Sequence, residues 1–190
     1  MNGDNGDTSN KTSIRSVTAN PKIPKTISLI GMPGAGKSTV GVILAKLTGL
    51  RFTDTDLDIQ VRENATLQEI LEQQDYQYLR GIEQDVLLSI ALDRTIISTG
   101  GSVVYSEPVM QRLKNAGAVV YLAAELPVLQ RRVAAAPLRG IASDARQSYA
   151  EVFAERTPLY KHYADITVDA DSGCADDVAA AILAQLRAIS

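Results

Sequence analysis

The sequence contains few of the residues from which disulfides, zinc sites and cysteine or serine hydrolases are built. Its 190 residues include one cysteine, Cys174, and one histidine, His162. A single cysteine excludes an internal disulfide and is consistent with a reducing compartment. One histidine and one cysteine do not make a zinc-ligand cluster, and they support no Ser-His or Cys-His relay. These classes of chemistry are therefore excluded.

The chain also lacks long apolar runs and a strong net charge. No apolar stretch approaches the length that crosses a bilayer, and residues 1–24 lack the apolar segment of a secretory signal. The formal net charge of −3 gives no general attraction for nucleic acid or anionic membranes. We expect a soluble, cytoplasmic protein that binds a small molecule, neither nucleic acid nor membrane, as a monomer or weak oligomer.

The composition predicts one folded domain behind a polar tail. Hydrophobic residues make up 45% and charged residues 22%, which is ordinary for a globular protein. Residues 1–24 are rich in Asn, Gly, Asp, Ser and Thr, which predicts a disordered tail. Residues 25–190 are long enough for one good core and show no internal repeat.

Strand and helix patterns alternate along this domain. Short β-branched runs predict strands at 26–30, 50–54, 95–99, 118–122 and 165–168. Helical patterns lie between and after them, at 38–48, 56–63, 66–73, 76–92, 106–115, 125–134, 146–162 and 175–188. The alternation predicts an α/β fold: a short parallel sheet of about five strands with helices on both faces. In such a sheet, ligands bind at the carboxyl ends of the strands.

The clearest motif is GMPGAGKST at residues 31–39. It matches G-x-x-x-x-G-K-[ST] and lies between a predicted strand and a predicted helix, the setting that this phosphate-binding loop requires. Its glycines let backbone N–H groups approach phosphate oxygens, at the positive end of the helix. Lys37 can reach the β- and γ-phosphates, and the Ser38 hydroxyl can ligate Mg²⁺. We expect ATP to bind to the loop residues Gly34, Ala35, Gly36, Lys37, Ser38 and Thr39.

Two further turns follow predicted strands. The sequence DTD (54–56) follows the second strand, and Gly100 and Gly101 follow the third. The carboxyl ends of parallel strands share one edge of the sheet, so both turns should converge on the phosphate loop. By its position alone, Asp56 could be either a functional carboxylate or the N-cap of the next helix.

With these turns, the chain resembles shikimate kinase, a compact member of the P-loop nucleoside-monophosphate-kinase-like group. The motifs are GAGKSTVG (34–41), FTDTD (52–56), LRGIEQDVL (79–87), STGGS (98–102), VVYL (119–122), RR (131–132) and ERTPLY (155–160). The resemblance covers roughly residues 27–168. It implies a three-layer P-loop kinase fold with a mobile lid at about 134–145. It also implies transfer of the γ-phosphoryl group of MgATP to shikimate, giving shikimate 3-phosphate in aromatic amino acid biosynthesis.

The resemblance implies roles for individual residues. Asp54 would bind Mg²⁺ through water, and Asp56 would face the accepting hydroxyl, orient it and accept its proton. Arg80 and Arg156 would bind a substrate carboxylate, because a planar guanidinium can make paired hydrogen bonds to it. Glu83, one turn beyond Arg80, would hold that guanidinium at helical spacing.

The same resemblance extends to the rest of the site. Gly100 and Gly101 would offer backbone that comes close to the substrate ring. Arg132 matches an adenine-side position, and Arg139 matches the lid arginine that neutralises charge on the transferring group. The predicted catalytic residues are Lys37, Asp56 and Arg139. For Tyr76 and Tyr78, pocket lining and simple packing both stay open.

Two positions depart from the pattern of the family. A third glycine of the turn is replaced by Ser102, which would take space beside the substrate or donate a hydrogen bond to it. Arg139 is followed by Gly140 and Ile141 instead of Pro and Leu. Both changes touch the part of the pocket that selects the hydroxy acid. A sister kinase for an aminoshikimate-like or gluconate-like acid, and a non-catalytic nucleotide-binding module, therefore stay open as alternatives.

Overall fold

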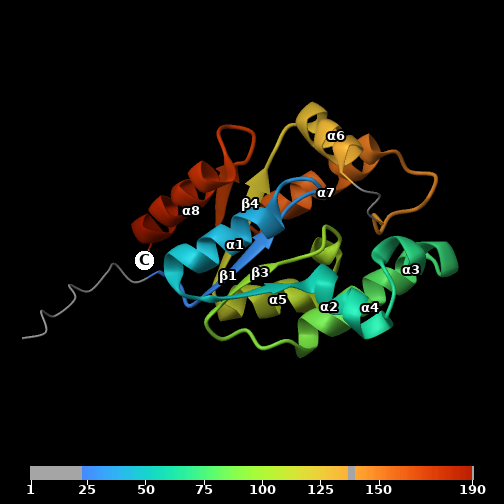
Figure 1. Cartoon of the computed structure of the whole chain (residues 1–190), viewed down its shortest axis with the longest axis horizontal. Helices are drawn as coiled ribbons and strands as arrows, with labels where there is room; N and C mark the ends of the chain where they lie inside the picture. The colour runs from blue at the N-terminus through green and yellow to red at the C-terminus, as the bar shows by residue number, and fades with distance from the viewer. Residues whose placement is uncertain (1–22, 137–139, 190) are drawn as a thin grey trace, which may run out of the picture.

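The computed structural model describes residues 23–136 and 140–189. Almost all of the predicted tail lies outside these residues, and so does Arg139 of the predicted lid. The described part forms one parallel sheet whose strands are Thr26–Ile30 (β1), Arg51–Asp54 (β2), Thr95–Ser98 (β3), Ala118–Ala123 (β4) and Ile166–Asp169 (β5). Their order in the sheet is β2-β3-β1-β4-β5, so β1 lies in the middle (Figure 1).

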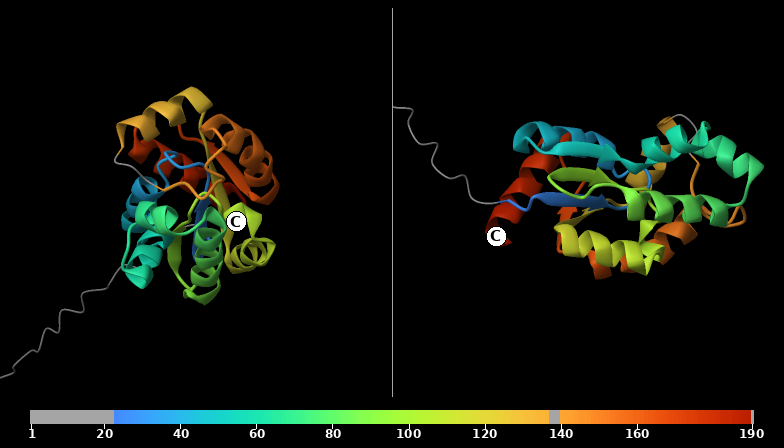
Figure 2. Two further views of the ribbon diagram at one scale, coloured as in Figure 1. Left: turned by 90° about the vertical axis from the view of Figure 1, so that its right-hand side faces the viewer. Right: turned by 90° about the horizontal axis from the view of Figure 1, so that it is seen from below.

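Helices follow the strands at almost the predicted positions. They are Lys37–Thr48 (α1), Thr55–Glu63 (α2), Leu67–Gln73 (α3), Tyr76–Ser89 (α4), Glu107–Ala116 (α5), Leu126–Ala135 (α6), Tyr149–Tyr163 (α7) and Ala175–Ile189 (α8), with a short 3₁₀ helix, Val103–Tyr105 (η1). Helices α1 and α8 pack together on one face of the sheet, while α5 and α7 cover the other (Figure 2). The predicted three-layer α/β fold is confirmed. No helix in the described ranges has both the length and the apolar character to cross a bilayer.

One helix end differs from the prediction. The pattern predicts a helix to residue 92, but α4 ends at Ser89 and Ile90 is already extended. The Arg112 guanidinium donates hydrogen bonds of 2.6 Å to the Leu87 carbonyl and 2.8 Å to the Ile90 carbonyl. These bonds satisfy carbonyls that helix continuation would otherwise satisfy, so the chain can turn away toward β3.

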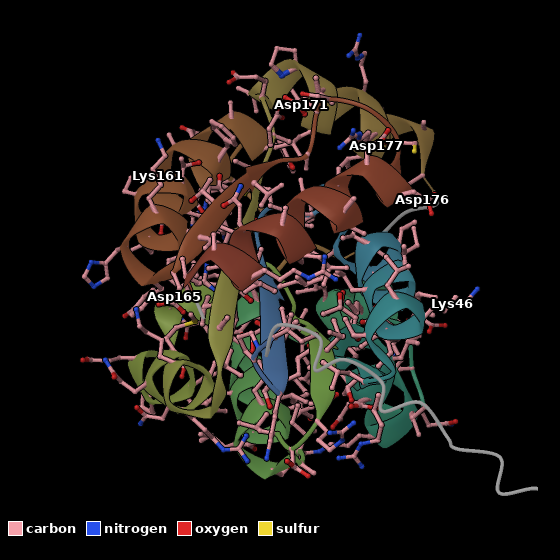
Figure 3. The ribbon with its side chains drawn as sticks, turned by 90° about the vertical axis from the view of Figure 1, so that its left-hand side faces the viewer. Lys46, Lys161, Asp165, Asp171, Asp176 and Asp177 are labelled. Carbon is pink, nitrogen blue, oxygen red and sulfur yellow. The ribbon has the colours of Figure 1, made fainter. Side chains whose placement is uncertain are left out.

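Charged residues complement the ends of the two helices that share a face. The first turn of α8 carries Asp176 and Asp177, and the last turn of α1 carries Lys46 (Figure 3). The Asp177 carboxylate accepts a hydrogen bond of 2.8 Å from the backbone N–H of Cys174, which caps the start of α8. Acidic groups at a helix start and basic groups at its end are favourable for the helix dipole.

The register of the sheet aligns the strand ends that carry the predicted site. Asp54 of β2 pairs with Ser98 of β3, and Ser98 pairs with Leu29 of β1. The phosphate loop leaves β1 immediately beyond that level. A small second core holds α2, α3 and α4 together beyond this edge and includes Ile59, Leu79 and Ala142.

We expect the central strand to dominate stability. Leu29 is fully buried in β1, so Leu29→Ala should lower the free energy of unfolding by about 3 kcal/mol through lost burial and a residual cavity. Urea unfolding at neutral pH measures this difference. The matched control is Leu47→Ala on the exposed side of α1, which should change it by less than about 0.5 kcal/mol. Equal effects of the two substitutions would contradict the assignment of β1 to the core.

Candidate active site

A cavity of about 410 Å³ lies at the carboxyl edge of the sheet. The three predicted turns meet there, because residues 33–39, Asp56 and residues 98–102 all line it. Residues 140–142, which follow α6 in the chain, and residues 173–175 at the start of α8 complete the lining. The phosphate loop and both strand-end turns therefore share one hollow.

The phosphate loop is shaped to receive an anion. Gly36 has φ 92, in the left-handed region that favours glycine, and as N-cap of α1 it offers no side-chain cap. The first N–H groups of α1 are therefore left for a ligand. Lys37 donates hydrogen bonds of 2.8 Å to the Gly31 carbonyl and 3.1 Å to the Met32 carbonyl, which hold its ammonium over the loop.

Lys37 is buried, and burial lowers its pKa to about 8. The carboxylates of Asp56, Asp54 and Glu83 act in the opposite direction, since negative charge nearby favours the ammonium form. A bound phosphate would add further negative charge at this point.

Two hydroxyl residues outside the predicted site, Ser98 and Thr99, lie beside the loop. The Ser38 Oγ and the Ser98 Oγ are 3.3 Å apart, which joins the start of α1 to the end of β3. The Thr99 hydroxyl donates a 2.9 Å hydrogen bond to the Leu29 carbonyl. Their signal in the sequence is their position at the end of the third predicted strand, in the STGGS motif ahead of Gly100.

The two carboxylates of the DTD turn have different places: that of Asp54 caps a helix, and Asp56 lines the cavity. Asp54, rather than Asp56, is the N-cap of α2, and its carboxylate accepts a 3.1 Å hydrogen bond from the Asp56 N–H. Asp56 lies in the first turn of α2 and lines the cavity. A Cβ placed on Gly100 would lie 3.1 Å from the Asp56 Oδ1, so the glycine lets this carboxylate approach the turn.

Two arginines from different helices converge on one carbonyl oxygen. Arg80 of α4 donates from Nε to the Ala142 carbonyl at 3.2 Å, and Arg156 of α7 donates from Nη2 at 2.7 Å. The Tyr105 ring lies beside both guanidinium groups, with its centroid 3.9 Å from the Arg80 Cζ and 5.3 Å from the Arg156 Cζ. Arg156 is 1% exposed. The two predicted carboxylate-binding residues therefore share one hydrogen-bond acceptor.

The two tyrosines before Arg80 have different environments. The Tyr76 ring lies 4.9 Å from the Arg80 Cζ and packs against the guanidinium. Tyr78 is 45% exposed and its hydroxyl donates to Glu63 at 3.3 Å. Only Tyr76 supports the site.

The prediction that Glu83 holds Arg80 is wrong. Glu83 is buried, and it accepts a hydrogen bond from the Ser102 hydroxyl. The Arg80 guanidinium turns instead toward the Ala142 carbonyl and the Tyr105 ring. Burial raises the pKa of Glu83 to about 7. Ser102, expected to occupy space beside the substrate or to bond to it, bonds to Glu83.

The other end of the cavity lies between α6 and the start of α8. The Arg132 Nη2 donates to the Ala170 carbonyl at 2.9 Å, and both residues line the cavity with Cys174. A Cβ on Gly34 would lie 3.0 Å from a Val133 methyl, so the loop packs directly on α6. Arg132 therefore lines the same cavity as the phosphate loop.

Comparison with known proteins agrees with this geometry. The family described as Shikimate kinase matches residues 33–187. The curated Shikimate kinase 2 of Escherichia coli O1:K1 is 37% identical over 147 residues, which are 75% of this chain and 84% of that protein. The chain belongs to the shikimate kinase family. The expectation of an ATP-dependent kinase of this family is thereby confirmed.

Solved structures of the family share the fold. A shikimate kinase from Acinetobacter baumannii in complex with shikimate has a TM-score of 0.78 and 30% identity, covering 90% of this chain and 96% of that one. The shikimate kinase from Aquifex aeolicus has a TM-score of 0.72 and 28% identity, and the match covers 86% of this chain and 96% of that one. The resemblance thus spans almost the whole described domain.

The pKa of Lys37 predicts a pH-dependent nucleotide affinity. Phosphate binding requires the ammonium form, which is lost as the pH rises through about 8 in the free protein. The affinity for ADP should therefore be about eightfold weaker at pH 9 than at pH 7.5, with proton uptake on binding at pH 9. Isothermal titration calorimetry in two buffers measures both quantities. Lys46→Met, at the exposed end of α1, is the control and should leave the slope unchanged; a flat wild-type profile would refute the role of Lys37.

Proposed function

We propose that this protein transfers the γ-phosphoryl group of ATP to a ring hydroxyl of shikimate, giving shikimate 3-phosphate and ADP. The observation that carries the proposal is the convergence of Arg80 and Arg156 on the carbonyl oxygen of Ala142, a residue that lines the phosphate-loop cavity. Two guanidinium groups aimed at one point suit a carboxylate, and shikimate carries a carboxylate and hydroxyls on one ring. The shikimate complex of the Acinetobacter baumannii relative supports the same assignment.

The nucleotide would extend from the phosphate loop toward α6. Its phosphates would accept hydrogen bonds from the N–H groups of residues 34–39 and interact with the Lys37 ammonium. Its base would lie near Arg132. In the phosphoryl transfer, the shikimate hydroxyl oxygen bonds to the γ-phosphorus while the bond to the β–γ bridging oxygen breaks, and ADP leaves. Arg139, outside the described residues, stays a predicted lid residue.

Asp56 would orient the attacking hydroxyl and receive its proton. Its carboxylate lines the cavity between the phosphate loop and Gly100. The transition state of phosphoryl transfer is loose, so positioning the oxygen in line with the leaving group contributes more than strong base catalysis.

The substrate carboxylate would replace the Ala142 carbonyl at the arginines. A carboxylate has two oxygens and a full charge, whereas the carbonyl offers one neutral oxygen to the same donors. Because Ala142 lies within the predicted lid, substrate binding and the position of residues 140–142 would be coupled. Gly101 would come close to the substrate, since a Cβ there would lie 3.0 Å from the Arg156 Nη1.

The oxygen groups beside the loop suit Mg²⁺. Ser38 would supply its hydroxyl and Asp54 would act through water, and the ion would neutralise charge on the β- and γ-phosphates. Among residues 23–136 and 140–189 no group of three or more metal-binding side chains occurs. Mg²⁺ commonly keeps several waters and takes few protein ligands together with phosphates, so the residues present fit it.

The proposal includes a cytoplasmic enzyme that works as a monomer or weak oligomer on a small-molecule substrate. The free, exposed thiol of Cys174 supports a reducing compartment. Residues 25–190 would form the single catalytic domain, and residues 134–145 would act as its lid.

Measurement of ADP release with MgATP tests the proposal directly. Purified protein should turn over shikimate with a KM between micromolar and millimolar, and should prefer it to aminoshikimate, gluconate and other hydroxy acids. Turnover with another acid alone would assign the protein to a sister activity. Absence of turnover with every acid would favour a nucleotide-binding module without catalysis.

Substitution of Arg156 should weaken the binding of shikimate without weakening the binding of ATP. Arg156→Lys replaces a planar donor pair with a point charge, so the KM for shikimate should rise about 100-fold while ATP affinity changes less than about twofold. Steady-state kinetics and nucleotide titration measure the two effects. Arg62→Lys on α2, where Arg62 pairs with Glu63 and Asp85, is the control and should change neither. An unchanged KM in Arg156→Lys would remove Arg156 from the site.

A further inference from the structure

Ser102 and Glu83 form a buried pair in the wall of the cavity. The Ser102 hydroxyl, just before η1, donates to the Glu83 Oε2 of α4, and each residue is 4% exposed. Both residues line the main cavity and also a smaller one of about 210 Å³ between α4 and η1. The pair therefore borders both cavities.

The second oxygen of Glu83 faces the active-site turn. A Cβ placed on Gly100 would lie 1.8 Å from the Glu83 Oε1 and 3.1 Å from the Asp56 Oδ1. The two carboxylates therefore approach the same glycine, one from α4 and one from α2. Within residues 23–136 and 140–189, the Glu83 Oε1 is buried and has no hydrogen-bond partner. A buried, unpaired carboxylate oxygen is costly, so its presence beside the reacting site points to a donor from a ligand.

The charged groups around Glu83 do not occupy this oxygen. Lys37 at the start of α1 and Arg156 of α7 favour the ionised form electrostatically, while Asp56 disfavours it. Lys37 donates to the Gly31 and Met32 carbonyls, and Arg156 donates to the Ala142 carbonyl. The Oε1 is thus held in a charged environment and remains available to a hydroxyl.

We propose that the Glu83 Oε1 accepts a hydrogen bond from a second substrate hydroxyl, next to the one that faces Asp56, and that Ser102 positions Glu83 for this contact. The inference rests on the proposed function and adds to it a requirement for neighbouring hydroxyls on a carboxylic acid. Ser102 acts through Glu83 and is a positioning residue. A glycine at this position would leave the carboxylate without the hydrogen bond that orients its Oε2.

The test is a kinetic comparison of Ser102→Ala, Glu83→Gln and the double variant. With shikimate, Ser102→Ala should raise the KM about fivefold with little change in kcat, as expected for loss of one hydrogen bond that orients an acceptor. The comparison is repeated with shikimate analogues that each lack one non-reacting hydroxyl. For the analogue that lacks the hydroxyl bound to Glu83, Ser102→Ala and the wild type should have the same KM. The double variant should be no worse than Glu83→Gln, since both substitutions remove the same contact.

Ser106→Ala is the matched control. Its hydroxyl donates a 2.6 Å hydrogen bond to Gln84, the residue after Glu83, but Ser106 lines only the smaller cavity. This variant should keep the wild-type KM for shikimate and for every analogue. A KM increase in Ser106→Ala equal to that in Ser102→Ala would show a general loosening of α4 and overturn the proposal.

The pH profile gives a readout that a packing role would not move. The Ser102 hydrogen bond lowers the pKa of Glu83, which burial raises to about 7. Because an ionised Glu83 accepts the substrate hydroxyl best, Ser102→Ala should shift the acid limb of kcat/KM to higher pH, and Ser106→Ala should not.

Activity of the wild-type protein distinguishes the role of Ser102 from the proposed function. A wild-type protein that turns over no shikimate overturns both. A wild-type protein that turns over shikimate, with an unchanged KM and pH profile in a folded Ser102→Ala variant, overturns the role of Ser102 alone. Equal KM increases for every analogue would show that Glu83 does not select a hydroxyl.

Discussion

The geometry of the active site depends on the pairing of β1 with strands on both sides. β1 lies between β3 and β4 and every residue in it is buried. The phosphate loop therefore begins at the centre of the sheet edge, where neighbouring strand ends can reach it. The register of β3 against β1 and of β2 against β3 sets Ser98 and Asp54 level with each other. A shift of one residue would move each side chain of the strand to the opposite face of the sheet, and the close packing of both faces opposes such a shift.

This edge concentrates charge in a poorly hydrated place. Lys37, Glu83 and Arg156 are all buried, and Asp56 acts electrostatically on the first two. Burial of unlike charges costs desolvation free energy that their mutual attraction only partly offsets. This desolvation lowers the pKa of Lys37 to about 8 and raises the pKa of Glu83 to about 7. A phosphate beside Lys37 and a carboxylate beside Arg156 would each place a negative charge next to a buried positive one. Substrate binding and the electrostatics of the free enzyme are therefore linked.

The Ala142 carbonyl connects Arg80 and Arg156, the two arginines proposed to bind the substrate carboxylate, to the segment after α6. Its side chain packs in the small core of α2, α3 and α4, while its oxygen accepts from Arg80 and Arg156. Gly140 is held close to the same helices, because a Cβ there would lie 2.6 Å from the Leu67 carbonyl. Glycine after the expected position of Arg139 thus has a packing reason in this chain: the backbone passes directly over α3. A side chain at position 140 would meet this backbone, so glycine suits the close approach.

The sequence by itself determined the order of strands and helices, the phosphate loop and the turns that carry the site. These features are local, because periodicity, glycine placement and the strand–loop–helix context of Lys37 are contained within short stretches. The partners of side chains were decided by tertiary structure. Helical spacing favoured a Glu83–Arg80 pair, but η1 brings Ser102 to Glu83, and residues 140–142 bring a carbonyl to Arg80. Asp56 was ambiguous until the backbone of the turn assigned the cap to Asp54. The partner of each of these side chains comes from a distant part of the chain, so its approach depends on how the elements pack and not on local spacing.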